Sequence, residues 1–396
     1  MGLAGLLWIA AVAAAVVLVG KNANSGPQAV PLPESVCAGP EIGVHSTLAF
    51  EGDAQRREAT VTAIQEFLHP QVVRDSLLWN QVEPVQGRRD WSRIDSVVEE
   101  LRAAGIEPLL VVYGSPSWAN GVPDSRPGYY LHVPPRGAAL DAWLAHYSDF
   151  LAAAVGRYHD YVRRWEIWNE PNLAAFWRPR PDPVAYRHVY ETLRATILRV
   201  DPAAEVAVGG LGGLSATSPP SIPGLAFLRR LTRTGTPIDN VAIHPYATGD
   251  HPPDLQIRGE NNFDDIGRVH HQLAAEGVRA SIWVTEWGWS SATVGESRQA
   301  RYVNRSLAML EHRYRFVRVA TYFVDHDLPP EFFQGLLGRN LEPKPAARVF
   351  RTHAERLADR CHLRHHLRVR GHELDSGGRR DRPLGKLAVR SSAKAP

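Results

Sequence analysis

Short apolar runs alternate with longer amphipathic stretches along most of this 396-residue chain. From Glu41 onward, the short runs are rich in Val, Ile and aromatic residues, and the stretches between them have helical periodicity. This alternation favours βα units and a parallel sheet. The predicted strands are residues 41–48, 71–79, 108–116, 163–171, 206–213, 240–247, 281–289 and 317–325.

Helices are predicted between these strands, for example at 91–104, 138–158 and 298–314, and one from 345 to about 357 follows the last strand. Eight βα units predict a closed (β/α)8 TIM barrel of the α/β class rather than an open doubly wound sheet. The Gly-rich segment 209–213 lacks the GxGxxG spacing of a dinucleotide site. Because barrel enzymes carry their chemistry at the C-terminal ends of the strands, candidate residues are sought there.

The two ends of the chain differ from the predicted barrel. Residues 3–19 carry no charge and would reach about 25 Å as a helix, close to the thickness of a bilayer. A polar, Pro-rich run follows, which favours an export segment over a buried core helix. The sequence leaves open whether this segment is cleaved. We predict an exported protein that is extracellular or in the cell envelope, either free or held by an N-terminal membrane anchor.

These observations divide the chain into four parts. The prediction is a signal peptide or membrane anchor at 1–20, a linker at 21–40, a catalytic domain at 41–360 and a basic disordered tail at 361–396.

Composition and charge exclude several classes of protein. Apolar residues make up 44% of the chain and charged residues 22%, which argues against a wholly disordered, collagen-like or polytopic membrane protein. Lys and Arg number 45 against 42 Asp and Glu, but residues 362–396 hold nine of the basic and three of the acidic residues. The part before this tail has no basic stripe long enough to bind a phosphate backbone, so no nucleic-acid partner is expected.

Cys37 and Cys361 are the only cysteines, and they flank the predicted barrel. Since the ends of a barrel lie close together, a disulfide between them is one interpretation in an oxidising compartment, and two free thiols are the other. Two cysteines cannot build a structural zinc site. The sequence predicts no metal and no cofactor.

The strongest chemical signal is a pair of carboxylates at the predicted active rim. Glu170 ends the fourth predicted strand in WNEP, and Glu286 ends the seventh in TEWGW. Glycoside hydrolysis needs two such groups, because one protonates the leaving oxygen while the other attacks the anomeric carbon or activates water. These two glutamates are the predicted catalytic residues.

Aromatic and polar residues accompany the pair. Tryptophans near the strand ends offer faces on which sugar rings can stack, and with the long loop 117–137 they predict an open cleft that grips a polymer. The predicted substrate-binding residues are His45, Arg74, Trp118, Asn169, Trp177, His244, Tyr246, Trp287, Trp289 and Tyr322.

Two further charged residues are predicted inside the barrel. Arg74 lies on the second predicted strand among apolar neighbours, where an unpaired charge would be costly, so it should meet a carboxylate. That pairing belongs either to the site or to the structure alone. Glu166 lies four residues before Glu170, about 13 Å deeper along the strand, and is interpreted as a barrel-interior partner of an arginine.

The order of these motifs resembles a known group of enzymes. Arg74, WEIWNEPN at 165–172, HPY at 244–246 and TEWGW at 285–289 are similar to the clan A retaining glycoside hydrolases. Within that clan, the segments 79–112 and 115–118 most resemble family 39, which includes β-xylosidases, α-L-iduronidases and bacterial exopolysaccharide-cleaving endoglycosidases. The resemblance covers roughly residues 41–357.

The resemblance implies Glu170 as acid/base, Glu286 as nucleophile, and Asn169 as a donor to the sugar 2-hydroxyl. It implies a retaining hydrolase that works by double displacement on an oligosaccharide or an envelope or extracellular polysaccharide. Two alternatives stay open. One is a non-catalytic carbohydrate-binding protein on the same barrel, which the presence of both glutamates disfavours. The other is a transglycosylase, which shares the covalent intermediate.

Other residues receive roles only through the resemblance. It implies that Tyr246 and Arg74 orient the nucleophile and that His244 lines the site. The eighth predicted strand departs from the family pattern, because the tryptophan expected near its end is here Tyr322 or Phe323.

Overall fold

The structure, a computed structural model, describes residues 39–328, 330 and 332–375, and of residues 361–375 it describes the backbone alone. Eight parallel strands form a closed barrel, in which each pairs with its sequence neighbours and β8 pairs with β1. This confirms the predicted (β/α)8 fold. The strands are β1 (Glu41–His45), β2 (Val72–Leu78), β3 (Glu107–Tyr113), β4 (Arg164–Asn169), β5 (Glu205–Leu211), β6 (Asn240–Ile243), β7 (Ser281–Val284) and β8 (Val317–Tyr322).

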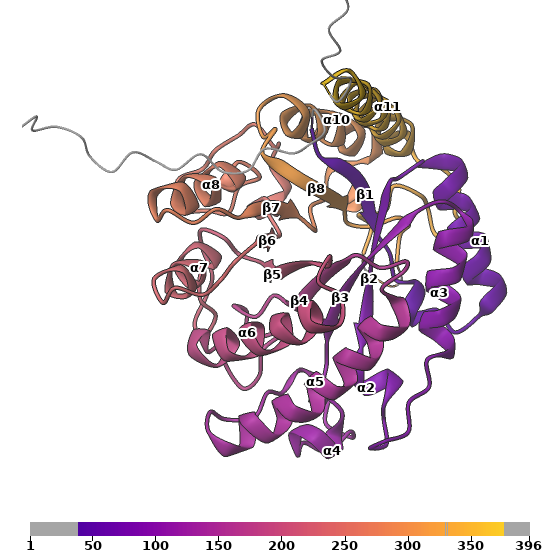
Figure 1. Cartoon of the computed structure of the whole chain (residues 1–396). Helices are drawn as coiled ribbons and strands as arrows, with labels where there is room; N and C mark the ends of the chain where they lie inside the picture. Colours follow the sequence, from indigo (N-terminus) through magenta and orange to yellow (C-terminus); the bar gives the residue numbers. More distant parts are fainter. Residues whose placement is uncertain (1–38, 329, 331, 376–396) are drawn as a thin grey trace, which may run out of the picture.

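Helices surround this barrel, as Figure 1 shows. The α-helices are α1 (Ala54–Phe67), α2 (Trp79–Val82), α3 (Ser92–Ala103), α4 (Ser117–Asn120), α5 (Ala138–Tyr158), α6 (Pro183–Val200), α7 (Gly224–Thr232), α8 (Asp265–Ala275), α9 (Ser291–Val294), α10 (Glu296–His312) and α11 (Pro345–Asp375). Three short 3-10 helices are η1 (Leu48–Phe50), η2 (Tyr129–Leu131) and η3 (Thr248–Asp250).

The predicted strands are in the right places but too long at their C-terminal ends. For example, β7 ends at Val284 rather than at residue 289, because Val284 is the last residue that pairs with both neighbouring strands. Beyond it the chain leaves the ladder, and its side chains spread around the mouth of the barrel. The bounds of α5 match the prediction. Helix α11 continues past the predicted end near 357, since no proline interrupts residues 358–375.

Apolar side chains fill the wall and the lower interior of the barrel. The larger cluster lies between the strands and the helices. A smaller one closes the interior and consists of Val72, Leu109, Ala207, Ala242, Trp283 and Val319. The alternation of side chains along each strand therefore separates a helix-facing set from an inward-facing set.

A charged cluster closes the N-terminal end of the barrel. The fully buried Arg164 of β4 lies 2.7 Å from Glu41, 3.2 Å from Glu107 and 3.4 Å from Glu205, each on a different strand. A buried arginine is tolerated when carboxylates surround it in this way. The opposite, C-terminal end is left for chemistry.

Some sequence predictions concern residues outside the described part. They are the segment 1–20, most of the linker 21–40, Cys37, and residues 376–396 of the predicted tail, and the side chain of Cys361 is likewise not described. Among the helices of the described residues, none combines the length and apolarity that a membrane crossing needs.

Candidate active site

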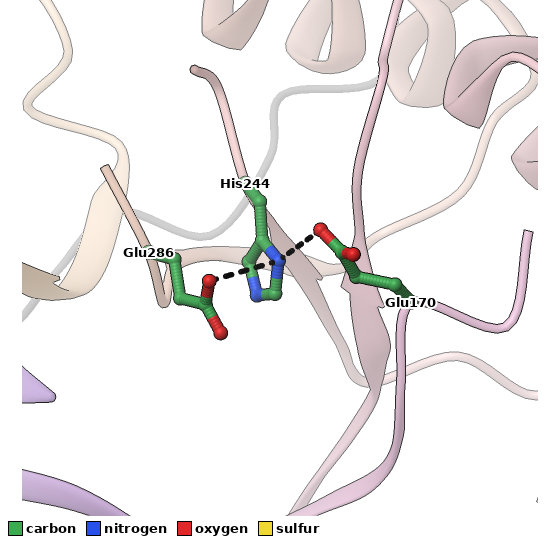
Figure 2. A group of neighbouring side chains, drawn as sticks. All are labelled: Glu170, His244 and Glu286. Carbon is green, nitrogen blue, oxygen red and sulfur yellow. Dashed lines mark hydrogen bonds and ion pairs between the residues drawn. The ribbon is translucent and has the colours of Figure 1, made fainter. Parts of the chain in front are cut away.

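Two glutamates face each other across the mouth of the barrel. Glu170 directly follows β4, and Glu286 is the second residue after β7. One oxygen of each carboxyl group and one ring nitrogen of His244 lie within 4.8 Å of one another. Figure 2 shows His244 between the two glutamates. The two glutamates are only 8% and 9% exposed. The structure therefore brings the predicted catalytic residues together in a nearly enclosed site.

The fully buried guanidinium of Arg74 organises the floor of this site. Its Nε and Nη2 atoms donate to the two oxygens of Glu166, each at 2.9 Å. Its Nη1 atom donates to Glu286 Oε1 at 2.8 Å and lies 2.8 Å from His45 Nδ1. Its Nη2 atom also donates to Asn169 Oδ1 at 2.9 Å. Arg74 thus meets two carboxylates, and Glu166 is the interior arginine partner that its depth predicted.

Tyr246 holds the second oxygen of Glu286. Its hydroxyl donates to Glu286 Oε2 at 3.1 Å, while Arg74 binds Oε1. Burial, followed by the charge of Glu286, raises the pKa of Tyr246 well above its usual value, so the hydroxyl keeps its proton. Both contacts fix the direction in which the carboxylate of Glu286 points.

His45 is neutral in this network. Burial lowers its pKa well below the usual value, and the charge of Arg74 lowers it further. Because a guanidinium can only donate, His45 Nδ1 accepts from Arg74 and its proton is on Nε2. His45 therefore keeps Arg74 in place without adding positive charge.

Glu170 lies in surroundings that favour a protonated carboxyl group. Burial raises its pKa to about 8; the charge of Arg74 opposes this shift and Glu166 adds to it. A carboxyl group with such a pKa keeps its proton at neutral pH, which is what a general acid requires.

His244 lies between the two glutamates and is also neutral. Its Nδ1 atom is 2.8 Å from Glu170 Oε1 and 3.6 Å from Glu286 Oε2. Burial lowers its pKa, although the charge of Glu286 acts in the opposite direction. Its Nε2 atom is buried and has no hydrogen-bond partner in the described part of the chain. Because a buried N–H without an acceptor is costly, the proton belongs on Nδ1, which donates to Glu170 Oε1.

A family model described as glycosyl hydrolases family 39 matches residues 72–302, which include Arg74 and both predicted catalytic glutamates. The chain belongs to glycosyl hydrolase family 39. The match ends before β8, the strand that departs from the family pattern.

Relatives of this family 39 chain include a curated beta-xylosidase from Caldicellulosiruptor saccharolyticus. The two are 26% identical over 208 residues, which is 49% of this chain but only 39% of that protein. The chain therefore aligns with well under half the length of this relative.

Solved structures of family 39 share the fold. A family 39 glycoside hydrolase from the gut symbiont Bacteroides cellulosilyticus WH2 is 24% identical, with a TM-score of 0.61 over 82% of this chain and 65% of that one. A monomeric beta-xylosidase from Caulobacter crescentus CB15 is 20% identical, with a TM-score of 0.61 over 81% of this chain and 69% of that one. At such identities the likeness concerns the fold.

Two glycines give this family 39 site its close packing. Gly210, in β5, accepts from the backbone N–H of Glu170 at 3.0 Å, and a Cβ atom at this position would overlap the ring of His244. Gly212 directly follows β5, and a Cβ atom there would overlap Glu170 Oε1. The Gly-rich segment that sequence analysis separated from dinucleotide binding therefore makes room for the predicted acid and its histidine.

We expect Gly212→Ala to impair the acid function of Glu170 selectively. The added methyl group would displace Oε1, the oxygen that His244 holds, and a displacement of about 1 Å can cost on the order of 10²-fold in rate. The value of kcat/KM should fall more for aryl glycosides with poor leaving groups than for those with good ones. Gly52→Ala is the matched control, because nothing lies within 4 Å of its Cβ position. An equal loss on both kinds of substrate would indicate general damage instead.

The prediction that three tryptophans stack on sugars was wrong. Trp177, Trp287 and Trp289 are 2%, 0% and 1% exposed. Trp177 packs edge-on against Tyr186 of α6, and the indole N–H of Trp287 donates to Ser306 of α10. Trp289 also packs against α10. Helices cover these three rings, so the rings pack behind the site and do not face a substrate. The predicted open cleft therefore loses the observation on which it mainly rested.

Phe323, rather than Tyr322, faces the site from the end of β8. Tyr322 is fully buried, and its hydroxyl accepts from the backbone N–H of Trp289. The ring of Phe323 stacks on His45 at 5.1 Å and meets Tyr246 edge-on at 6.2 Å. The prediction of Tyr322 as a substrate contact was therefore wrong. Strand periodicity could have found Phe323, because it shares the inward face with Val319.

Trp118 lies on the side of the mouth formed by α4 and α5. Its indole N–H donates to the carbonyl of Glu83 at 3.0 Å, and its ring meets Trp79 and His146 edge-on. It is partly buried and shares no described contact with the two catalytic glutamates. Its predicted role in substrate binding stays a prediction.

The two glutamates and His244 are also residue types that ligate metals. Within residues 39–328, 330 and 332–360, the one group of ligand-type side chains close enough to share an ion is Glu170, His244 and Glu286. However, Arg74 and Tyr246 already occupy both oxygens of Glu286. The guanidinium 2.8 Å away would also repel a cation, so the donor set fits a catalytic carboxylate pair better than a metal site.

Proposed function

We propose that this chain is a retaining glycosidase in which Glu170 is the acid/base and Glu286 the nucleophile. The observation that carries the proposal is the separation of their oxygens, within 4.8 Å. Retaining enzymes hold their carboxyl groups about 5–5.5 Å apart, whereas inverting enzymes need about 6.5–9.5 Å to admit a water molecule between carboxylate and sugar. Membership of family 39 supports the same reaction class.

In the first proposed step, the carboxylate of Glu286 attacks the anomeric carbon. The bond from that carbon to the glycosidic oxygen breaks, and the oxygen takes the proton of Glu170. Because Nδ1–H of His244 donates to Oε1 of Glu170, the acidic proton is left on Oε2, where it can reach the substrate. The products are a free leaving-group sugar and an ester between Glu286 and the remaining sugar.

In the second proposed step, Glu170 acts as a base. Its carboxylate takes a proton from water, the water oxygen attacks the anomeric carbon, and the ester bond to Glu286 breaks. Asn169 supports both steps, because Arg74 binds its Oδ1 atom and leaves its amide N–H groups free to donate to the sugar 2-hydroxyl.

The proposed substrate is an oligosaccharide or a polysaccharide of the cell envelope or its surroundings. The uncharged segment 3–19 followed by a Pro-rich run supports export, with or without membrane anchoring. The similar protein from Caldicellulosiruptor saccharolyticus is named a beta-xylosidase, so aryl β-xylosides are sensible first substrates.

Retention of anomeric configuration is the expected result of this mechanism. Proton NMR during the first turnovers, before mutarotation, should show a product anomer with the configuration of the substrate. Two displacements at one carbon restore its configuration, while a single attack by water inverts it. An inverted first product would contradict the assignment of Glu286 as nucleophile.

A further inference from the structure

A cavity of about 570 Å³ opens at the C-terminal end of the barrel, where β1 and β8 meet. It lies between the segment after β1, helix α1 and the segment after β8, and its wall includes Ser46 and His326. Ser46 directly follows His45 of the Arg74 network. His326 directly follows Asp325, whose backbone N–H donates to the carbonyl of His45 at 3.0 Å. The cavity is therefore joined through neighbouring residues to the groups that hold the nucleophile.

Three basic side chains line this cavity, namely Arg56, Arg339 and His326. The guanidinium of Arg56 donates to the backbone carbonyl of Arg339, and that of Arg339 donates to the backbone carbonyl of Pro330 at 3.1 Å. Throughout the described residues, no carboxylate lies within 4.0 Å of either guanidinium. Burial lowers the pKa of His326, but Asp325 raises it above the usual value. The charge of Arg56 is close enough to act against Asp325. Among the residues that the structure describes, no anion therefore faces either guanidinium.

The acidic residues of the wall are already engaged. Asp327 accepts from Lys344 at 2.7 Å and from the backbone N–H of Gly335 at 3.0 Å. Glu51 accepts from the backbone N–H of Asp53 at 2.9 Å. Lys344 neutralises Asp327, so among the described lining residues the two arginines outnumber the single remaining carboxylate, that of Glu51.

An exposed aromatic ring completes the wall. Phe50, at the end of η1, is 45% exposed and lines the cavity. It offers an apolar face of the kind on which a sugar ring can stack, which the buried tryptophans cannot. An aromatic face beside cations suits a ligand with both an apolar ring face and an anionic substituent.

We propose that this cavity binds a sugar residue that carries a negatively charged substituent, a carboxylate or a sulfate ester, next to the residue at which cleavage occurs. Arg56 and Arg339 would bind the anion, and Phe50 would stack on the ring. The inference rests on the proposed glycosidase function and names the class of polysaccharide that it would use.

Binding of matched polymers tests the proposal. Polygalacturonate, glucuronoxylan and alginate are each compared with their carboxyl-reduced forms, and xylan sulfate is compared with xylan, by affinity electrophoresis of the full chain. At least one polyanion should bind about tenfold more tightly than its neutral counterpart, as expected for a charge-assisted contact. The carboxylate and sulfate pairs distinguish the two sources of charge.

Variants connect that preference to the cavity. Arg56→Gln and Arg339→Gln should each reduce the preference at least about threefold, and Arg56→Lys, which keeps the charge, should restore most of it. Arg279→Gln is the matched control, because Arg279 is an exposed arginine two residues before β7, at the opposite end of the barrel. This control should keep the preference of the wild type. The basic C-terminal residues are present in every variant, so they cannot cause a difference between variants.

Two results would overturn the proposal. One is the absence of any preference for the charged polymer throughout the panel. The other is a preference that survives in the double variant of Arg56 and Arg339. Failure of the glycosidase proposal would give a different result. The wild-type chain would then release no aryl leaving group, or would release it at the same rate when Glu286 is replaced.

Discussion

Replacing Glu286 by Gln is expected to lower kcat/KM for an aryl glycoside by about 10⁴-fold or more, as for other catalytic nucleophiles. An amide is too weak a nucleophile to attack the anomeric carbon. Steady-state kinetics measures the loss, and circular dichroism checks that the variant is folded.

Glu100→Gln is the matched control for that variant. Glu100 also pairs with an arginine, Arg57, at 2.9 Å, but on helices α3 and α1 outside the mouth. Its activity should stay within about twofold of wild type, since partly exposed ion pairs contribute little. Azide adds a test of the role: in Glu286→Ala it should give a glycosyl azide of inverted configuration. A Glu286→Gln variant with more than a tenth of wild-type activity would contradict the assignment.

Replacing Glu170 by Gln should have the second-largest effect, and its size should depend on the leaving group. Substrates with poor leaving groups should lose about 10²–10⁴-fold, the usual contribution of a general acid. Dinitrophenyl glycosides, which leave without protonation, should be spared in the first step. Azide should rescue Glu170→Ala with retained configuration, because it then attacks the ester on Glu286. Equal losses for all leaving groups would place the acid elsewhere.

The same residue sets the pH dependence. Burial raises the pKa of Glu170 to about 8, and the protonated form is the one that donates. For the wild type, kcat/KM on poor leaving groups should therefore hold to about pH 7 and fall as the pH rises through about 8. This basic limb should be absent in Glu170→Gln. If it is unchanged in that variant, another group titrates there.

Much of the architecture could be predicted from the sequence. The alternation of strands and helices is encoded locally, so the barrel and the positions of all eight strands follow from spacing. The proximity of Glu170 and Glu286 was also predictable, because each follows the end of a strand, and a parallel barrel brings such ends together. Arg74 was found because a charge inside an apolar strand demands a partner.

The sequence did not predict the direction of side chains that follow the end of a strand. Trp287 and Trp289 flank the nucleophile in sequence, yet both rings turn toward helices. Regular alternation stops where the ladder stops, so the period-two rule gives no direction for residues beyond Val284.

The basic cavity was equally hidden, for a different reason. Arg56 and Arg339 are separated by most of the chain and lie in segments with no distinctive motif. Only closure of the barrel, with β8 beside β1, brings these two segments together. A single sequence without known contacts offers no signal for such a meeting.

The five contacts of Arg74 mean that neighbouring substitutions will not be energetically independent. One planar group holds Glu286, Asn169, His45 and the deeper Glu166 at once, so a change at any of them alters the hydrogen-bond geometry available to the others. In double-mutant cycles, pairs drawn from this set should show substantial coupling energies, whereas remote pairs should add. Evolution or engineering therefore has little freedom to retune this centre one residue at a time.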